Sequence, residues 1–249
     1  MSISIGVVGK PNAGKSTLFS ALTMADAKIA PFPFTTIEPN RAVAYIRKPC
    51  PHGEIGKQCT PRDSSCVKGV RFIPIQITDV AGLVPDAHLG KGLGLQFLDD
   101  IRQADALIQV VDASGRTDLE GNASEGCEPT LEVEFLEKEM THWIAGILER
   151  NWAKVGGKPA SALYDVFSSM KIGHAHVEAA VRKLGLPETL NWKEDERFAF
   201  AEEMRRVKPV LIAANKWDIA SGTRRLMDRY EGNVVRCAAA YELALRKAA

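Results

Sequence analysis

The sequence has no apolar run that reaches the ~18 residues of a membrane-spanning helix, and it therefore predicts no membrane span. It also lacks an excess of charge of either sign, because its formal net charge is +1. A broad electrostatic field that would attract nucleic acid or a membrane surface is thus excluded, and any such partner would need a local patch. The N-terminus lacks the basic region and long apolar core of a secretory signal, and it reads as a first strand.

Cysteine is scarce as well, with five residues in a chain of 249. An odd number of cysteines without an export signal favours reduced thiols over a disulfide framework, so the cytoplasm is the expected compartment. The rest of the composition, 45% apolar and 25% charged, is that of an ordinary globular protein. The length suits one large domain or one domain with an insertion.

Short apolar, β-branched runs predict buried strands that alternate with helical patterns. The strands are expected at residues 3–8, 71–78, 106–111 and 210–214. The first ends at Gly9 and each of the other three ends near an Asp or Asn, and ligands of open α/β sheets bind at the carboxyl ends of the strands. We therefore predict an α/β fold with a mostly parallel sheet flanked by helices, and one shared site at this edge.

A different pattern lies between the last two of these strands. Apolar residues recur at helical spacing from Leu131 onward, and further helix-like segments follow near residues 161–170, 174–184 and 193–206. We predict a main domain in two parts, residues 1–130 and 207–249, with an α-helical insertion at 131–206 for which a coiled-coil hairpin is one form. The alternative left open is that these helices simply cover the sheet.

The segment after the first strand reads "GKPNAGKS" and fits the phosphate-loop pattern G-x-x-x-x-G-K-[ST] in full. A predicted strand precedes this segment and a predicted helix follows it, which is the context that this motif requires. Its backbone N–H groups would form a nest for a phosphate, with Lys15 reaching the β- and γ-phosphates and Ser16 binding Mg²⁺. The predicted phosphate-binding residues are Gly9, Lys10, Pro11, Asn12, Ala13, Gly14, Lys15, Ser16 and Thr17.

A second motif, "DVAG", ends the strand at 71–78. Asp79 would hold the Mg²⁺ through water, and the N–H of Gly82 would sense the γ-phosphate. The next residue, Leu83, stands where a glutamine often orients the attacking water. Leucine neither donates nor accepts a hydrogen bond, so hydrolysis would need another group.

The strand at 210–214 leads into Asn215, Lys216 and Asp218. An ionised carboxylate only accepts hydrogen bonds, which suits the two N–H donors on one edge of guanine and opposes the acceptor at N1 of adenine. Lys216 would lie over the purine ring, and Asn215 would tie this segment to the phosphate loop. The small residues at 237–239 would approach the base, and the N–H of Ala239 is the favoured contact to guanine O6, with a register uncertainty of one residue.

Together these motifs resemble the Obg family of P-loop GTPases, and more narrowly its YchF branch in the archaeal form. The resemblance rests on "GKPNAGKSTLFSALT", "FPFTTIEPN", "DVAGLV" and the helical block before "NKWD", and it covers essentially the whole chain. It implies a P-loop G domain, GTP or GDP as ligand, Mg²⁺, and association with ribosomes. Thr36, next to Thr35, resembles the first-switch threonine that closes on Mg²⁺. The C-terminal TGS domain of such proteins is not seen.

The same resemblance leaves the nucleotide and the catalytic group open. Many YchF proteins prefer ATP, but those lack the Asp of the base motif, which this chain keeps as Asp218. With a leucine at position 83, an asparagine like Asn12 is associated in Obg-related proteins with a bound K⁺, which could offset charge between the phosphates. His88 is a second candidate, since an imidazole can orient water near neutral pH.

Four potential zinc ligands, Cys50, His52, Cys59 and Cys66, lie in one loop between strands. Their types suit Zn²⁺, but their spacings do not match a common C-x₂-C pair, so a plain loop of reduced thiols is favoured. For the whole chain the leading hypothesis is a slow Mg²⁺-dependent GTPase. The alternatives are an ATPase of the same fold and a nucleotide-gated binding module with negligible turnover of its own.

Overall fold

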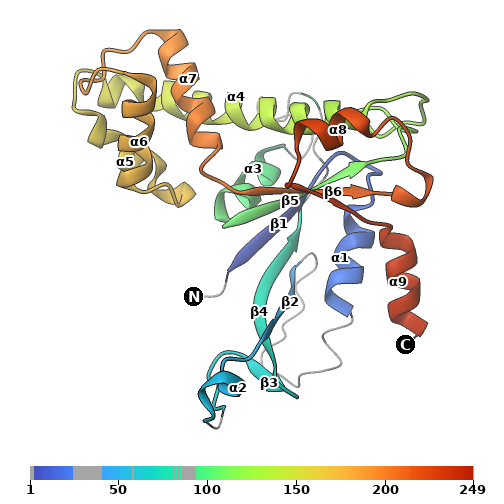
Figure 1. The fold of residues 1–249 in the computed structure, drawn as a ribbon. Coiled ribbons are helices and arrows are strands. Elements are labelled where there is room, and N and C mark those ends of the chain that lie inside the picture. Colours follow the sequence, from blue (N-terminus) through green and yellow to red (C-terminus); the bar gives the residue numbers. More distant parts are fainter. Residues whose placement is uncertain are drawn as a thin grey trace.

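The computed structural model describes residues 3–24, 41–57, 59–80, 82, 85 and 94–248. Its centre is a seven-stranded sheet in the order β2-β4-β1-β5-β6-β7, with β3 paired to β4 (Figure 1). Neighbours from β4 to β7 run parallel, whereas β2 and β3 are antiparallel to β4. The strands are β1 (Ser4–Val8), β2 (Arg41–Pro49), β3 (Ser65–Val67), β4 (Val70–Asp79), β5 (Ala106–Asp112), β6 (Val210–Asn215) and β7 (Val234–Arg236). The predicted α/β class is confirmed.

Helices cover both faces of this sheet. Successive residues of β1 show the division, because Val7 packs with Leu18 of α1 and Ala239 of α9, whereas Val8 packs with Phe97 of α3. Figure 1 shows α1 and α9 side by side on one face. The helices are α1 (Lys15–Met24), α2 (His52–Ile55), α3 (Gly94–Gln103), α4 (Pro129–Val155), α5 (Leu163–Phe167), α6 (His174–Leu184), α7 (Glu194–Arg205), α8 (Arg224–Arg229) and α9 (Ala239–Ala248), with 3-10 turns η2 (Ala160–Ala162), η3 (Ser168–Met170) and η4 (Trp217–Ile219).

The first half of β4 forms a ribbon with β2 and β3 that projects from the rest of the sheet (Figure 1). Pro74 lies within this half. Proline has no backbone N–H, so it cannot donate a hydrogen bond to a neighbouring strand on the side that its nitrogen faces. It is tolerated because the pairing of β4 with β1 starts only at Gln76. β4 therefore has an outer end at Val70 and an inner end at Asp79, beside the phosphate loop.

The helical segment between β5 and β6 starts with α4, which is 27 residues long and begins at Pro129, ahead of the expected boundary at residue 131. Its first half covers the sheet, since Leu136 and Met140 share a buried cluster with Val8 and Leu107. Its second half leaves the sheet and carries α5, α6 and α7 (Figure 1). α4 therefore packs on the sheet along its first half and on the other helices of this segment along its second half.

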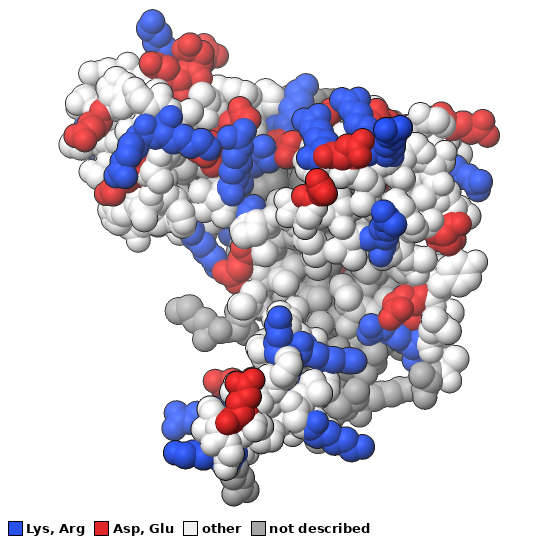
Figure 2. All heavy atoms as spheres, in the orientation of Figure 1, with Lys and Arg blue, Asp and Glu red and all other residues white. Residues whose placement is uncertain are grey.

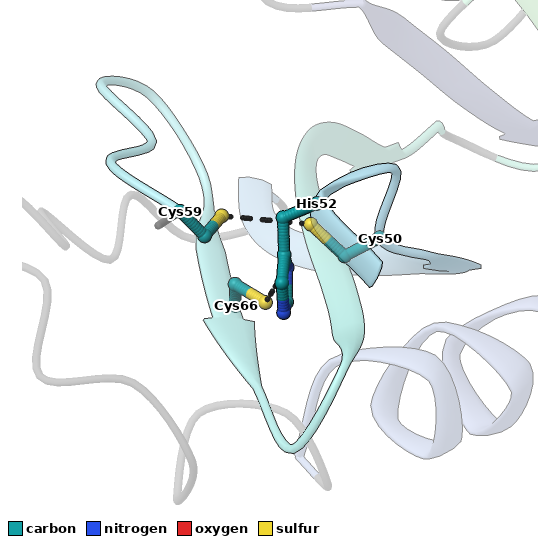
Figure 3. Close-up of side chains that lie close together, drawn as sticks. All are labelled: Cys50, His52, Cys59 and Cys66. Carbon is teal, nitrogen blue, oxygen red and sulfur yellow. Dashed lines mark hydrogen bonds between the residues drawn. The ribbon is translucent and has the colours of Figure 1, made fainter. Parts of the chain in front are cut away.

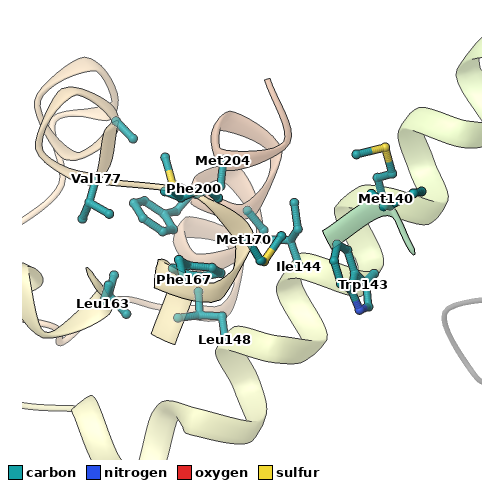
Figure 4. Packing of buried hydrophobic residues seen from close by; sticks show 14 of the residues in the cluster. Met140, Trp143, Ile144, Leu148, Leu163, Phe167, Met170, Val177, Phe200 and Met204 are labelled. Carbon is teal, nitrogen blue, oxygen red and sulfur yellow. The ribbon is translucent and has the colours of Figure 1, made fainter. Parts of the chain in front are cut away.

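A compact apolar core holds the outer part of this segment together. Figure 4 shows Leu148 of α4, Phe167 of α5, Val177 of α6 and Phe200 of α7 in one cluster. The Phe200 ring centroid lies 4.9 Å from that of Trp192 and 6.1 Å from that of Phe167. The segment is therefore a small helical bundle and not a coiled-coil hairpin, because several short elements cover α4 in place of one long partner.

Acidic and basic side chains are interspersed over the face of the molecule seen in Figure 2, which agrees with the near-neutral net charge. Within the described part of the chain, every helix is too short or too polar to cross a bilayer.

Candidate functional site

The loop between β1 and α1 is held in a conformation that requires glycine at two positions. Gly9 has φ +146°, and a Cβ there would lie 2.3 Å from the carbonyl oxygen of Val110. Gly14 has φ +98°, and its Cβ would lie 2.2 Å from Nδ2 of Asn215. Helix α1 begins directly afterwards at Lys15. The first N–H groups of a helix lack intrahelical partners, so the loop and the helix start together offer donors to an anion.

Lys15 lies across this loop. Its ammonium donates to the carbonyl oxygen of Lys10 at 2.8 Å, and the residue is buried. Burial lowers the pKa of Lys15 below its ordinary value, although Asp79 and Glu132 favour the charged form. An ammonium removed from water in this way gains strongly from an anionic partner.

Ser16 and Asp79 bring the two phosphate motifs into contact. The Ser16 hydroxyl donates to Oδ2 of Asp79 at 2.5 Å, whereas Oδ1 of Asp79 is buried without a hydrogen-bond partner among the described residues. A buried carboxylate oxygen without a donor suits a water of a hydrated cation, so the donor set fits Mg²⁺. Gly82 lies beside the loop as well, since a Cβ on it would come 3.2 Å from Cγ of Pro11.

The side chain of Lys10 points away from the loop into the interior. Its ammonium pairs with Oε1 of Glu132 on α4 at 2.9 Å and donates to the carbonyl oxygen of Thr117 at 2.6 Å. Both charged side chains are almost fully buried, at 1% and 6% exposure. Only the backbone of Lys10 therefore faces the phosphate side. The ion pair ties the phosphate loop to the first turn of α4.

Asn12 takes a left-handed conformation with φ 61°, and its amide nitrogen donates to the carbonyl oxygen of Gly121 at 2.9 Å. Gly121 packs tightly against the loop, because a Cβ on it would lie 2.8 Å from the Pro11 carbonyl oxygen. The segment around Gly121 was not expected from the sequence to take part in this site. No local motif marks it, since its role comes from a contact distant in sequence.

Asn215 connects the base-motif segment to two other segments. Its amide nitrogen donates to the carbonyl oxygen of Ala13 at 2.9 Å, which is the tie expected from the sequence. Its amide oxygen accepts the N–H of Ala239 at 2.9 Å. The predicted contact from Ala239 to the base therefore needs correction, because that N–H is already used and the residue is buried. The half-buried Ala238 precedes it, within the one-residue uncertainty of the prediction.

Lys216 and Asp218 follow at the carboxyl end of β6. Lys216 has φ 59°, and its ammonium donates to Oδ2 of Asp112 at 2.7 Å. Burial alone would raise the pKa of Asp112, but hydrogen bonds from Lys216, Ser114 and Thr117 outweigh it, and the pKa lies below its ordinary value. Asp218 is exposed in η4. The Asp112 partnership was missed, although a carboxylate ending a strand at this edge was a usable signal.

Not all predicted residues fall in the described part of the chain. Thr36 with its neighbour Thr35, Leu83 and His88 lie outside it. The four cysteine-loop residues Cys50, His52, Cys59 and Cys66 are described, and they lie together at the outer end of the β2–β4 ribbon. The described phosphate and base residues instead gather at the carboxyl ends of β1, β4 and β6.

Comparisons with known proteins match this arrangement. A family model described as "50S ribosome-binding GTPase" matches residues 4–144. An uncharacterized GTP-binding protein of Methanocaldococcus jannaschii is 45% identical over 98% of this chain, and one of Schizosaccharomyces pombe is 44% identical over 87%. The "Ribosome-binding ATPase YchF" of Bacillus subtilis is 30% identical over 86%. The chain spans only 65%, 56% and 57% of the length of these relatives.

Two solved structures of related proteins have the same fold as this chain. The crystal structure of a GTP binding protein from Pyrococcus horikoshii has a TM-score of 0.81 and 40% identity, covering 99% of this chain and 67% of that one. The YchF GTPase of S. pombe, with a TM-score of 0.56 at 23% identity over 99% of this chain and 68% of that one, shares the fold.

Proposed function

Because the chain belongs to the 50S ribosome-binding GTPase family and to its YchF-like members, we propose that it is a molecular switch that binds GTP with Mg²⁺ and hydrolyses it slowly. One observation carries the proposal. The phosphate loop touches both other motifs, through Ser16 with Asp79 on one side and Ala13 with Asn215 on the other. One ligand could therefore meet the loop, a cation site and a base-reading segment at the same time.

In the proposed complex, the phosphates lie on the N–H groups of residues 9–17 at the start of α1. Lys15, whose ammonium donates to the Lys10 carbonyl oxygen, would turn it to the β- and γ-phosphates. Its burial supports this role, because a phosphate oxygen restores the solvation that the ammonium lacks. The N–H of Gly82 would contact the γ-phosphate.

Mg²⁺ would be held by Ser16 directly and by Asp79 through water, with Thr36 as the third residue proposed. Two observations support this donor set: the Ser16–Asp79 hydrogen bond, and Oδ1 of Asp79, which has no partner among the residues that the structure describes. When bound, the ion neutralises negative charge that develops on the phosphate oxygens during transfer. Asp79 also keeps the Ser16 hydroxyl oriented for the ion.

The base would be read by Asp218, with Lys216 along the purine face and the N–H of Ala238 toward O6. Lys216 is anchored by Asp112, which fixes where its aliphatic stem can lie. The second candidate function, ATP hydrolysis, is favoured by the names of two relatives, the B. subtilis YchF and an Obg-like ATPase of Danio rerio that is 34% identical over 68% of this chain.

Competition of unlabelled ATP and GTP against a fluorescent GTP analogue, with and without Mg²⁺, tests the proposal. We expect GTP to compete at least ~10²-fold better than ATP, since an adenine acceptor facing Asp218 leaves both groups unpaired. Equal competition would favour the ATPase alternative, and binding indifferent to Mg²⁺ would remove the cation role of Ser16 and Asp79.

For the hydrolysis step we propose that Asn12 supplies its amide oxygen to a K⁺ beside the phosphates. The hydrogen bond from its nitrogen to Gly121 supports this, because fixing one end of the amide also fixes the other. Turnover in K⁺ should exceed turnover in Na⁺ at equal ionic strength, and Asn12→Ala should lose that difference. Equal rates in both salts would shift the role to His88, for which His88→Ala is the test.

The physiological partner proposed is the ribosome, as the name of the B. subtilis relative suggests for its own longer chain. The compartment proposed is the cytoplasm. Single-turnover hydrolysis with and without ribosomes separates an enzyme from a binding module. A rate that stays negligible in both cases would identify a nucleotide-gated binding module, in which Leu83 leaves the water without an orienting group.

A further inference from the structure

The outer end of the β2–β4 ribbon carries four metal-binding side chains, far from the nucleotide site. Cys50 follows β2 directly, His52 opens α2, Cys59 lies in the loop after α2, and Cys66 is in β3. Figure 3 shows the four side chains pointing toward one another. The nucleotide side of β4 ends at Asp79, which the length of a strand places ~30 Å from Val70 at the outer end.

The distances among these side chains match a metal site. Sγ of Cys50 lies 3.5 Å from Sγ of Cys59, and Sγ of Cys66 lies 3.5 Å from Nδ1 of His52. A tetrahedral zinc ion with Zn–S bonds of ~2.3 Å has edges of ~3.8 Å between two sulfurs and ~3.6 Å between sulfur and nitrogen. The four ligand atoms all lie within 4.8 Å of one another, so closing the longest separation by roughly 1 Å completes the tetrahedron.

These distances do not describe a disulfide. Bonded sulfurs would lie ~2.05 Å apart, and all five cysteines carry free thiols, the three in this cluster included. Among the described residues at positions 50–69, moreover, only Cys50 is buried, and Ile55 is 64% exposed. A segment with so little apolar burial cannot offset its own ordering entropy, so its fold calls for a cross-link of another kind.

Arg71 of β4 supplies charge compensation beside the cluster. Its guanidinium donates to Sγ of Cys50 at 3.3 Å and to Sγ of Cys59 at 3.2 Å, and it also donates to the Ser64 hydroxyl at 2.9 Å. Three thiolates and one neutral imidazole around a divalent ion leave one net negative charge. A cation that donates to the ligating sulfurs is the outer-shell partner that such a site needs.

We propose that Cys50, His52, Cys59 and Cys66 form a structural zinc site that closes the outer end of the β2–β4 ribbon. Three sulfurs and one nitrogen in a tetrahedron are the ligands that Zn²⁺ selects. All four positions are filled by the protein, so the ion cross-links the segment between β2 and β3 and has no open position for catalysis. The site is independent of the proposed nucleotide function.

The test measures metal in the full chain, purified under reducing conditions, by native mass spectrometry and elemental analysis. We expect about one zinc per chain, and at least a ~tenfold lower content in the double variant Cys59→Ser/Cys66→Ser. Cys127→Ser, which changes a cysteine outside the cluster, should keep the full content. Replacement by Co²⁺ should give the intense visible bands of tetrahedral thiolate coordination in wild type and Cys127→Ser but not in the double variant.

Binding of the fluorescent GTP analogue, measured in the same samples, shows whether the remainder of each variant is folded. Zinc loss with nucleotide binding retained supports the site. The proposal is overturned if wild type holds no stoichiometric zinc, if it holds iron instead, or if the double variant keeps its zinc. It is also overturned if the mass of protein purified under argon shows the loss of two hydrogens that a disulfide within the cluster would cause.

Discussion

Asn215 is the residue on which the proposed site depends most. Its buried amide donates to the Ala13 carbonyl and accepts the Ala239 N–H, so it holds the phosphate loop, β6 and the start of α9 together. Asn215→Ala would leave two buried backbone groups unpaired, each worth about 1–3 kcal/mol. We expect the free energy of unfolding to fall by roughly 2–4 kcal/mol, and GTP affinity to fall at least ~tenfold because loop and base segment lose their alignment.

Chemical denaturation and equilibrium nucleotide binding check this expectation. Asn122→Ala is the matched control, since Asn122 is exposed and its amide nitrogen donates to the carboxylates of Asp118 and Glu120. It should change stability by less than ~1 kcal/mol. A stable Asn215→Ala protein with unaltered GTP affinity would show that the tie to Ala13 does not position the loop.

We expect Glu132 to make the stability of the molecule depend on pH. Burial raises the pKa of Glu132 to about 7, even though the Lys10 ammonium opposes the shift. The folded protein therefore holds the proton more tightly than the unfolded chain does. The stabilising contribution of Glu132 is complete below its ordinary pKa of 4.5 and is lost progressively as the pH rises to about 7.

We predict that the difference in free energy of unfolding between wild type and Glu132→Gln falls by up to about 3 kcal/mol between pH 4.5 and pH 8. Urea denaturation at a series of pH values measures it. Glu178→Gln, at an exposed position of α6, is the control and should follow wild type throughout. A constant difference across the range would mean that Glu132 stays ionised in its pair with Lys10.

Among the elements, the helical bundle at the end of α4 is held by its own apolar core. Phe200 is fully buried there, whereas Phe198 on the same helix is 40% exposed. We predict that Phe200→Ala lowers the free energy of unfolding by about 3–5 kcal/mol. Phe198→Ala should cost less than ~1 kcal/mol. Thermal unfolding of both variants is the measurement, and equal losses would contradict the assignment of Phe200 to the core.

The same helices show why part of the fold is predictable from sequence. α6 and α7 appear almost where their periodic patterns place them, because amphipathic spacing is a local signal. The four apolar strand runs are likewise found as β1, β4, β5 and β6. β2 and β3 lack such a signal, since their pairing with β4 lies in a ribbon in which only one of their side chains is fully buried.

The candidate site divides in the same way. Short sequence motifs predict the positions of four site residues, because the spacing within each motif fixes which groups lie close together. These residues are Gly9, Lys15, Ser16 and Asp79. The pairing of Lys10 with Glu132 could not be predicted from such a motif, because it arises only when α4 packs against the loop. Cys66 similarly meets His52 only after the β3–β4 hairpin has turned the chain back, which explains why the cysteine spacing alone favoured a plain loop.

At the scale of the whole molecule, the parallel strands collect the proposed nucleotide contacts at one edge of the sheet. The helical bundle and the ribbon end project away from that edge (Figure 1). The proposed nucleotide site, the helical bundle and the proposed metal site would thus occupy separate parts of one α/β domain. The central claim concerns the first of these, a site that selects guanine through Asp218.

Exchanging the base specificity tests that claim most directly. Xanthine carries an acceptor at C2 where guanine carries a donor, and an asparagine amide can donate where a carboxylate only accepts. Equilibrium binding of GTP, XTP and ATP to wild type and Asp218→Asn is the measurement. We predict that Asp218→Asn weakens GTP binding at least ~10²-fold and strengthens XTP binding by a similar factor. GTP binding equal in the two proteins, or ATP binding to wild type as tightly as GTP, would contradict it.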